Sequence, residues 1–166
     1  MDNKAKIVKL VSLRPGIHLR ELQRVLGLSF NSVRYNAERL SESGEIYCEK
    51  TKGFARLYPS GTPEQDRIIY SLIQNKTTKK LLEELTKEPA LTNKELTERT
   101  GLAKSTVSEH VHALMKPQLV RMILSEEGNF KVELQEQERV KNILVKDREI
   151  SLNKDIVANF ADLWDF

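Results

Sequence analysis

The sequence predicts a mainly α-helical protein with small β-hairpins, built as two tandem units followed by C-terminal helices. One reason is an internal repeat, in which a stretch near the start of the chain recurs 74 residues later. A second is the recurrence of apolar residues at helical spacing between Gly and Pro breaks. A third is a strand–turn–strand pattern after the last helix of each repeat. We expect units at residues 1–60 and 61–134 and a helical tail at 135–166.

The internal repeat has the spacing of a helix, a Gly-bearing turn and a second helix that begins with small polar residues. The matching positions are Pro15, Glu21, Leu22, Gly27, Leu28, Ser32, Val33 and Leu40 in the first copy, and Pro89, Glu95, Leu96, Gly101, Leu102, Thr106, Val107 and Leu114 in the second. This is the pattern of a helix-turn-helix, whose second helix enters the major groove of DNA. The repeat therefore predicts a DNA-binding protein.

The first unit is predicted to contain three helices. The first ends at Pro15-Gly16 and carries Ile7, Leu10, Val11 and Arg14 at helical spacing. The second covers residues 18–26, and Gly27 then supplies the backbone freedom for a tight turn. The third runs over residues 30–43, with Ser29 as its N-cap. Its inward face is expected to hold Val33, Ala37 and Leu40.

The outward face of the third helix holds the side chains that we expect to read DNA. Arg can bond guanine with two hydrogen bonds and Asn can do the same with adenine, while Tyr and Ser can bond phosphate. The alternative is an ordinary solvated helix face. The DNA-contact candidates of this segment are Ser29, Asn31, Ser32, Arg34, Tyr35, Asn36 and Arg39.

A β-hairpin is predicted directly after this helix, with strands at residues 45–50 and 54–58 and a turn between them. A hairpin in this place is the wing of a winged helix. Lys50, Lys52 and Arg56 would give the wing positive charge for phosphates or for the minor groove. The single cysteine, Cys48, excludes an intramolecular disulfide; we expect a packing residue, with a redox sensor as the alternative.

Charge is unevenly distributed between the two expected units. Residues 1–60 hold eleven Lys and Arg against six Asp and Glu, whereas residues 61–166 hold 16 against 18. A basic first part suggests that it faces a polyanion, although scatter in a Lys- and Glu-rich chain would look similar.

The second unit is expected to begin after a break in periodicity at residues 59–63. A short helix at residues 66–74 is followed by one capped by Thr77 or Thr78, and Thr92 and Glu95 have capping-box spacing. The next helix offers weaker DNA-contact candidates, because Glu109 stands where the first copy has Tyr35 and would repel phosphate. Its wing, at residues 120–125 and 130–134, has acidic residues at the turn, so this unit is expected mainly to support assembly. The weaker candidates are Lys104, Ser105, Thr106 and Ser108.

Metal, cofactor and catalytic sites are not predicted. His110 and His112 are two residues apart and would face different directions on a helix, whereas metal pairs prefer three or four. The sequence has no phosphate-binding Gly loop and no nucleophile with a matching base, so we expect no enzyme activity and no cofactor. Neither a signal peptide nor a membrane span is recognised, so the cytoplasm is the expected location.

The tail is predicted to be helical at residues 135–148, with Ser151 capping a last helix. That helix would carry an apolar stripe, which either a second copy of the chain or the chain's own second unit would cover. We favour a homodimer, because two-fold symmetry is the commonest oligomer and matches palindromic operators. The dimerisation candidates are Ile156, Phe160, Leu163 and Trp164.

In the order of these motifs the chain resembles archaeal transcriptional regulators with tandem winged helix-turn-helix domains of the ArsR/MarR-like kind. The matching segments are residues 27–36 with 57–61, residues 101–108, and the ending at 160–164. The resemblance implies promoter binding through Ser32, Arg34, Tyr35 and the first wing. It implies no metal sensing, because the thiol ligands of metal-responsive members are missing.

The sequence is also compatible with two further functions. One group of the resembling proteins, the euryarchaeal archaellum regulators, activates motility genes, and the resemblance makes that role a candidate. The alternative to a DNA-binding regulator is a protein-interaction module, which would bind the transcription machinery with little DNA affinity of its own.

Overall fold

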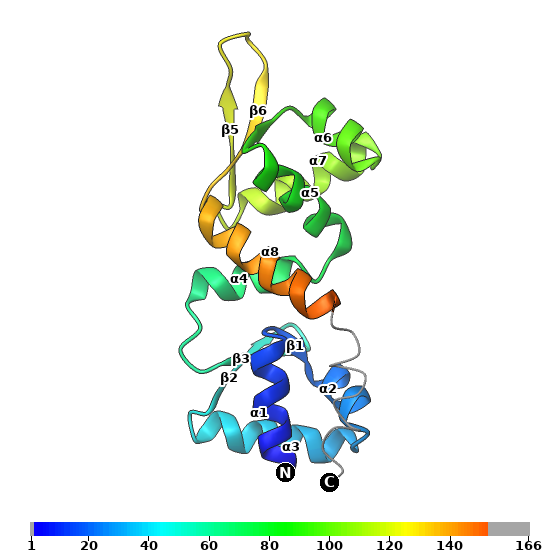
Figure 1. Cartoon of the computed structure of the whole chain (residues 1–166), viewed down its shortest axis with the longest axis vertical. Coiled ribbons are helices and arrows are strands. Elements are labelled where there is room, and N and C mark those ends of the chain that lie inside the picture. The colour runs from blue at the N-terminus through cyan, green and yellow to red at the C-terminus, as the bar shows by residue number, and fades with distance from the viewer. Residues whose placement is uncertain (1, 153–166) are drawn as a thin grey trace. The chain divides into compact units, whose positions relative to one another are not determined.

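The computed structural model of the chain describes residues 2–152, which form two compact units (Figure 1). The first unit extends to Arg67 and includes the described residues from Lys146 on, and the second covers Ile68–Val145. These boundaries differ from the expected 1–60, 61–134 and 135–166. The beginning of the tail belongs with the second unit because Val140, Ile143 and Leu144 are buried in its core.

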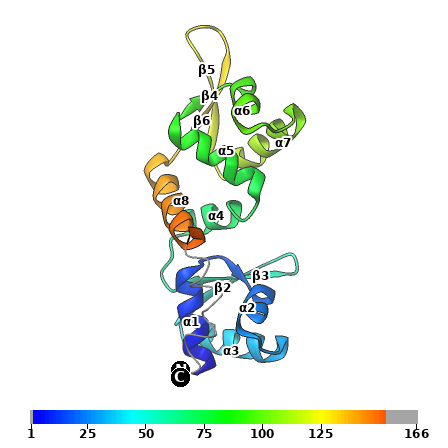
Figure 2. The ribbon, with the colours of Figure 1, turned by 45° about the vertical axis from the view of Figure 1, so that its right-hand side comes forward.

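The first unit combines three helices with a three-stranded antiparallel sheet in the order β1–β3–β2. Ile17 on β1 and Cys48 on β2 both lie opposite Leu57 on the central strand. Figure 2 shows the β2–β3 hairpin projecting past the helices. In chain order the elements are α1 (Asn3–Leu13), β1 (Ile17–His18), α2 (Leu19–Leu26), α3 (Phe30–Glu42), β2 (Ile46–Thr51) and β3 (Phe54–Pro59).

The second unit repeats this order from α5 to β6, and its sheet has the equivalent order β4–β6–β5. Its hairpin also projects from the helices (Figure 1). The elements after β3 are α4 (Glu64–Leu72), α5 (Lys76–Lys87), β4 (Ala90–Leu91), α6 (Asn93–Thr100), α7 (Lys104–Met115), β5 (Val120–Leu124), β6 (Phe130–Leu134) and α8 (Gln137–Leu152). Strands β1 and β4 were not predicted, because two residues carry no alternation pattern.

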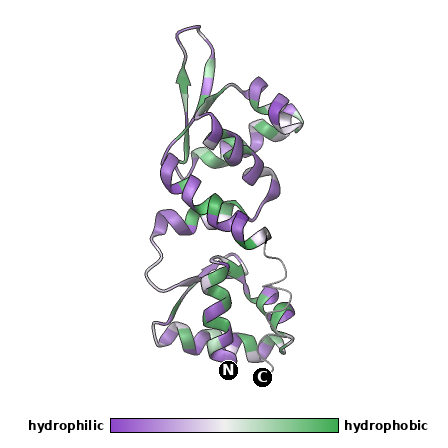
Figure 3. Cartoon of the chain, in the orientation of Figure 1, coloured by the Kyte–Doolittle hydropathy of each residue, from purple (hydrophilic) through white to green (hydrophobic). Residues whose placement is uncertain are grey.

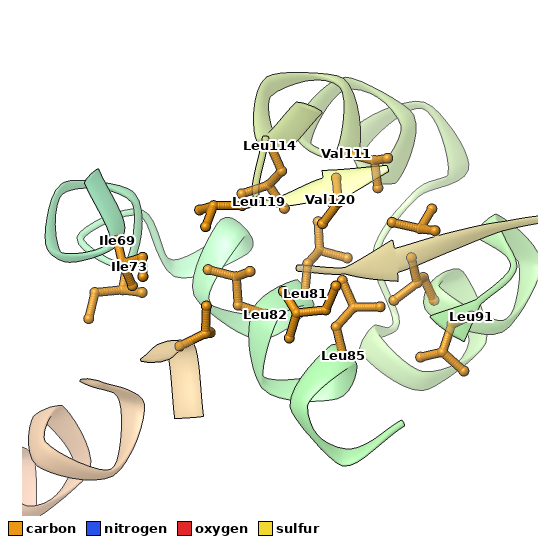
Figure 4. Close-up of a cluster of buried hydrophobic side chains, with 14 of the residues drawn as sticks. Ile69, Ile73, Leu81, Leu82, Leu85, Leu91, Val111, Leu114, Leu119 and Val120 are labelled. Atoms are coloured by element: carbon orange, nitrogen blue, oxygen red, sulfur yellow. The ribbon is translucent and has the colours of Figure 1, made fainter. Parts of the chain in front are cut away.

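Each unit has a hydrophobic core of its own. In the first, Leu10, Leu22 and Leu57 are fully buried together with the inward face of α3. In the second, Leu81, Leu82 and Leu85 of α5 lie among the residues of the surrounding helices and strands (Figure 4). Along the helices, hydrophobic and hydrophilic stretches alternate (Figure 3), as expected for helices that bury one face and expose the other.

Two predicted helix caps are confirmed and one is wrong. The Ser29 side chain accepts a hydrogen bond from Ser32 N, and Thr92 with Glu95 forms a complete capping box. The cap of α5 is neither Thr77 nor Thr78: the side chain of Asn75 accepts hydrogen bonds from both of their backbone N–H groups. An Asn side-chain oxygen is well placed to cap because it reaches the second and third amides of the helix.

Several element boundaries also differ from the predicted ones. His18 precedes α2 rather than opening it, because His18 pairs with Arg56 in the sheet. Helix α4 begins and ends two residues earlier than the expected 66–74. Helix α8 continues through Ser151 to Leu152, and the last helix that Ser151 was expected to cap lies outside the described residues. Arg14 lies outside the core, at the C-cap of α1, and its guanidinium pairs with Glu21.

Arg67, in the first turn of α4, contacts the first hairpin. Its guanidinium lies 4.5 Å from the Tyr47 ring centroid and 3.8 Å from the Glu49 carboxylate. It also donates to the Thr62 carbonyl at 2.8 Å, while the Tyr58 hydroxyl donates to the carbonyl of Arg67. These contacts explain why the first unit extends beyond residue 60.

We predict that Arg67→Ala lowers the free energy of unfolding by about 2 kcal/mol, because it removes a half-buried charge-assisted hydrogen bond and a cation–π contact together. Urea denaturation followed by circular dichroism measures this. Arg34→Ala is the control: that side chain is 56% exposed, so its loss should change stability by less than about 0.5 kcal/mol. Equal effects of the two substitutions would contradict the structural role of Arg67.

The capping box yields a second prediction. Replacing Thr92 with Ala should cost about 1 kcal/mol, since the amide of Glu95 loses its side-chain acceptor. Thr97, on the same helix, donates only to the carbonyl of Asn93, so Thr97→Ala should be close to neutral. Thermal unfolding of both variants distinguishes a capping effect from a general preference for alanine, which would give the two variants the same melting temperature.

Candidate nucleic-acid interface

The outward face of α3 is exposed, as the sequence predicts. Val33, Ala37 and Leu40 recur every three to four residues and are buried in the first core. This spacing turns Asn31, Arg34 and Tyr35 outward, and the Tyr35 side chain is 55% exposed. The nearest carboxylate oxygen to Arg34 belongs to Glu38, at 4.0 Å, which is a weak surface pair.

Other candidates on this helix already make hydrogen bonds. Ser29 caps α3, and the Asn36 amide donates to the Ser32 carbonyl at 2.8 Å. Arg39 Nε donates to the Tyr35 hydroxyl at 3.2 Å, with its guanidinium 5.4 Å from the ring centroid. The side chains of Ser29 and Asn36 thus stabilise the N-terminal part of α3 through hydrogen bonds to its backbone. Tyr35 and Arg39 instead form an exposed pair whose side chains are oriented by their mutual hydrogen bond.

On the first hairpin, two of the three predicted cations project into solvent. Lys50 and Lys52 are exposed near a turn in which Lys52 has a φ of 31° and Gly53 one of 85°, a conformation that suits glycine. Arg56 lies differently: it is half-buried and donates from Nη1 to the Gly16 carbonyl at 3.0 Å. This hydrogen bond links strand β3 to Gly16, the residue before β1. Arg56 therefore stabilises the first unit and does not serve as an outward contact.

A cavity that the sequence did not predict lies between α2 and this hairpin. It has a volume of about 800 Å³ and is lined by the start of α2, by Phe30 and by the turn of the hairpin. Arg20 and Arg24 of α2 join Lys50 and Lys52 around it. Because the two arginines are four residues apart, the sequence predicts that they share one face of α2. That this face lies next to the hairpin follows from the pairing of β1 with β3, which the sequence did not predict.

His18 and Cys48 are among the titratable groups of this unit whose pKa values are shifted. Burial, followed by the nearby charge of Arg56, lowers the pKa of His18, so the imidazole is largely neutral at pH 7. Burial raises the pKa of the Cys48 thiol above its usual range. A thiol that resists ionisation reacts slowly with oxidants, which agrees with the packing role expected for Cys48.

The second unit presents a different surface at the equivalent places. Lys104, Ser105 and Ser108 are exposed on α7, and Thr106 is half-buried. At the tip of its hairpin, Leu124 lies opposite Phe130, and these side chains are 65% and 64% exposed. The equivalent pair in the first hairpin is Lys50 opposite Ala55.

The structure also bears on metal binding, membrane spans and the dimerisation candidates. In residues 2–152, no group of three His, Cys, Asp or Glu side chains is arranged to hold a metal ion. No helix in the same range combines the length and apolarity of a membrane span. The four dimerisation candidates, Ile156, Phe160, Leu163 and Trp164, lie outside the described residues.

Comparison with known proteins gives one family match. Residues 66–121 match the model of a winged helix-turn-helix DNA-binding family. A solved structure of a MarR family protein from Bacillus stearothermophilus is 19% identical, with a TM-score of 0.41, over 94% of this chain and 83% of that one. No curated protein sequence matches. Residues 66–121 are thus similar to a winged helix-turn-helix DNA-binding family, and the described residues form a winged-helix fold that is mainly helical with small antiparallel sheets.

Proposed function

We propose that this protein is a transcription regulator that binds specific sequences of double-stranded DNA at promoters. Helix α3 enters the major groove, and the β2–β3 hairpin lies on the adjacent backbone or in the minor groove. The observation that carries the proposal is the uncovered polar face of α3, beside a hairpin with exposed Lys50 and Lys52. Recognition helix and wing are the two DNA-contacting parts of a winged helix.

Within this interface the residues take different roles. Arg34 bonds guanine and Asn31 adenine, because each can make two hydrogen bonds to the base edge. The Tyr35–Arg39 pair and the two wing lysines bind phosphates, which supplies affinity without sequence information. The corresponding helix of the second unit contributes more weakly, because Glu109 replaces Tyr35 there.

The proposal extends to two tandem winged helix-turn-helix domains and a homodimer. The shared element order and sheet order of the two units support the tandem arrangement, with the family match at residues 66–121 falling on the second. A two-fold dimer would place two α3 helices on half-sites about 34–36 Å apart, or a multiple of that distance. The apolar ending of the sequence is our candidate for the dimer contact.

A specific observation also favours a second candidate function, a protein-interaction module that binds the transcription machinery. Leu124 and Phe130 are exposed on the second hairpin beside Glu126 and Glu127 at its turn. Such a surface suits a protein partner better than phosphate. Electrophoretic mobility shift on promoter and random DNA separates the two functions, since the module alone would shift neither.

For Arg34→Ala we predict a loss of about 1–3 kcal/mol in binding at a single base position, because one bidentate contact to guanine disappears. The measurement is a competition assay with every single-base variant of the selected site. Arg34→Lys is the matched control, since lysine keeps the charge but not the two parallel hydrogen bonds. If Arg34→Lys kept full sequence preference, Arg34 would be a phosphate contact and not a base reader.

For Lys52→Ala we predict a uniform loss of affinity across sequences, with the slope of log affinity against log salt reduced by about one unit. Filter binding over a range of salt concentrations gives this slope. Lys87→Ala removes an exposed lysine that pairs with Glu84 on α5 and should leave the slope unchanged. An unchanged slope for Lys52→Ala as well would argue against a contact between the wing and DNA.

A further inference from the structure

The cavity beside the first hairpin combines an apolar lining with an exposed aromatic ring. Leu19, Phe30 and Ala55 contribute apolar surface, and the Phe54 side chain at its edge is 63% exposed. The Phe54 ring meets His18 at a centroid distance of 5.7 Å with the planes tilted by 50°. Much of the ring is therefore left for a flat ligand to cover.

The rim of the same cavity is positively charged. Arg20, Arg24, Lys50 and Lys52 line it, and Arg20 is held with its guanidinium 5.2 Å from the Phe30 ring centroid. The one carboxylate in the lining, Glu21, is engaged by Arg14 and lies 3.6 Å from Arg24. The rim thus keeps excess positive charge toward solvent, which suits a ligand with more than one negative charge.

We infer that this cavity binds a nucleotide, with the base stacked on Phe54 and the phosphates held by the cations of α2 and the hairpin. A base supplies the flat face that an open aromatic ring accepts, and stacking tolerates any base because each has a π-face. A phosphate chain supplies the multiple negative charges. A volume of about 800 Å³ lies in the range of ligand pockets and leaves room for both parts.

The inference rests on the proposed DNA-binding function in one respect. Lys50 and Lys52 serve there as phosphate contacts, so a free nucleotide in the cavity would compete with DNA and lower its affinity. The same chemistry could also come from DNA itself, as an unpaired nucleotide turned toward the hairpin. Both sources share the base on Phe54 and the phosphate on the cations.

The second unit shows that the common scaffold does not require these residues. The positions of Arg20 and Arg24 are occupied there by Lys94 and Glu98, and the position of Lys50 by Leu124. The second unit thus keeps a cation at the position of Arg20 but not at the positions of Arg24 and Lys50, although both sheets have the same strand order. The full set of four cations is therefore not needed to fold a unit of this kind.

Isothermal titration calorimetry of the full chain with ATP, in buffer without divalent metal, tests the site. Adenosine and inorganic tripolyphosphate serve as the two halves of the ligand, and ATP should bind more tightly than either. Phe54→Ala should weaken ATP binding about 5- to 150-fold through lost stacking. Phe130→Ala is the matched control, because Phe130 is 64% exposed on the other hairpin, and it should leave ATP binding unchanged.

A second arm identifies the source of the nucleotide. The wild-type chain and Phe54→Ala are titrated with a perfect duplex and with the same duplex carrying one unpaired adenine. A preference for the unpaired adenine that disappears in Phe54→Ala identifies DNA as the source; ATP binding without that preference identifies the free nucleotide.

Three results would overturn the inference. The first is that tripolyphosphate binds as tightly as ATP, and the second is that Phe54→Ala and Phe130→Ala change the affinity for ATP equally. The third is that Phe54→Ala changes the affinity neither for ATP nor for the duplex with an unpaired adenine. None of these would affect the proposed function, which depends on binding of the perfect duplex. Conversely, ATP binding by a chain that ignores duplex DNA would leave the cavity site standing and remove the proposed function.

Discussion

The pairing of β1 with β3 is the interaction on which the geometry of the first unit depends. Strand β1 is two residues long, yet Ile17 is buried opposite Leu57, and the amide of Gly16 donates to the Leu57 carbonyl at 2.8 Å. Arg56 adds a hydrogen bond in the other direction, to the carbonyl of Gly16. Because α2 begins immediately after His18, this short pairing fixes the start of α2 beside the hairpin, and the cavity follows from it.

The second unit has the equivalent pairing, of β4 with β6, but its hairpin carries different side chains. Leu91 pairs with Val132, and the amide of Leu134 donates to the carbonyl of Pro89 at 2.7 Å. Once the base of a hairpin is held in this way, its tip contributes little to the core and is free to differ. Lys50 opposite Ala55 gives a cationic tip, whereas Leu124 opposite Phe130 gives an apolar one. Two surfaces of different chemistry thus stand on one scaffold.

The sequence was sufficient to predict features whose causes are local. The buried faces of α3 and α7 follow from helical periodicity, and Ser29 and Thr92 cap because their side chains reach amides two or three residues away. The sequence could not predict β1 and β4, which exist only through partners some forty residues distant in the chain. The cavity was missed for the same reason, since Arg24, Phe30 and Lys50 come from three separate elements.

If the first unit binds DNA as proposed, its charges divide the work of binding between its elements. On α3 each arginine has an acidic neighbour: Arg34 lies 4.0 Å from Glu38, and Arg39 3.9 Å from Glu42. A helix balanced in this way attracts a polyanion weakly, so its value lies in the geometry of its hydrogen bonds to base edges. The excess positive charge lies instead on α2 and the hairpin, in Arg20, Lys50 and Lys52. In the proposed complex, most of the long-range attraction and of the salt dependence of binding should therefore come from these two elements, with Arg39 adding one phosphate contact. Discrimination between sequences should come from the base-reading residues of α3.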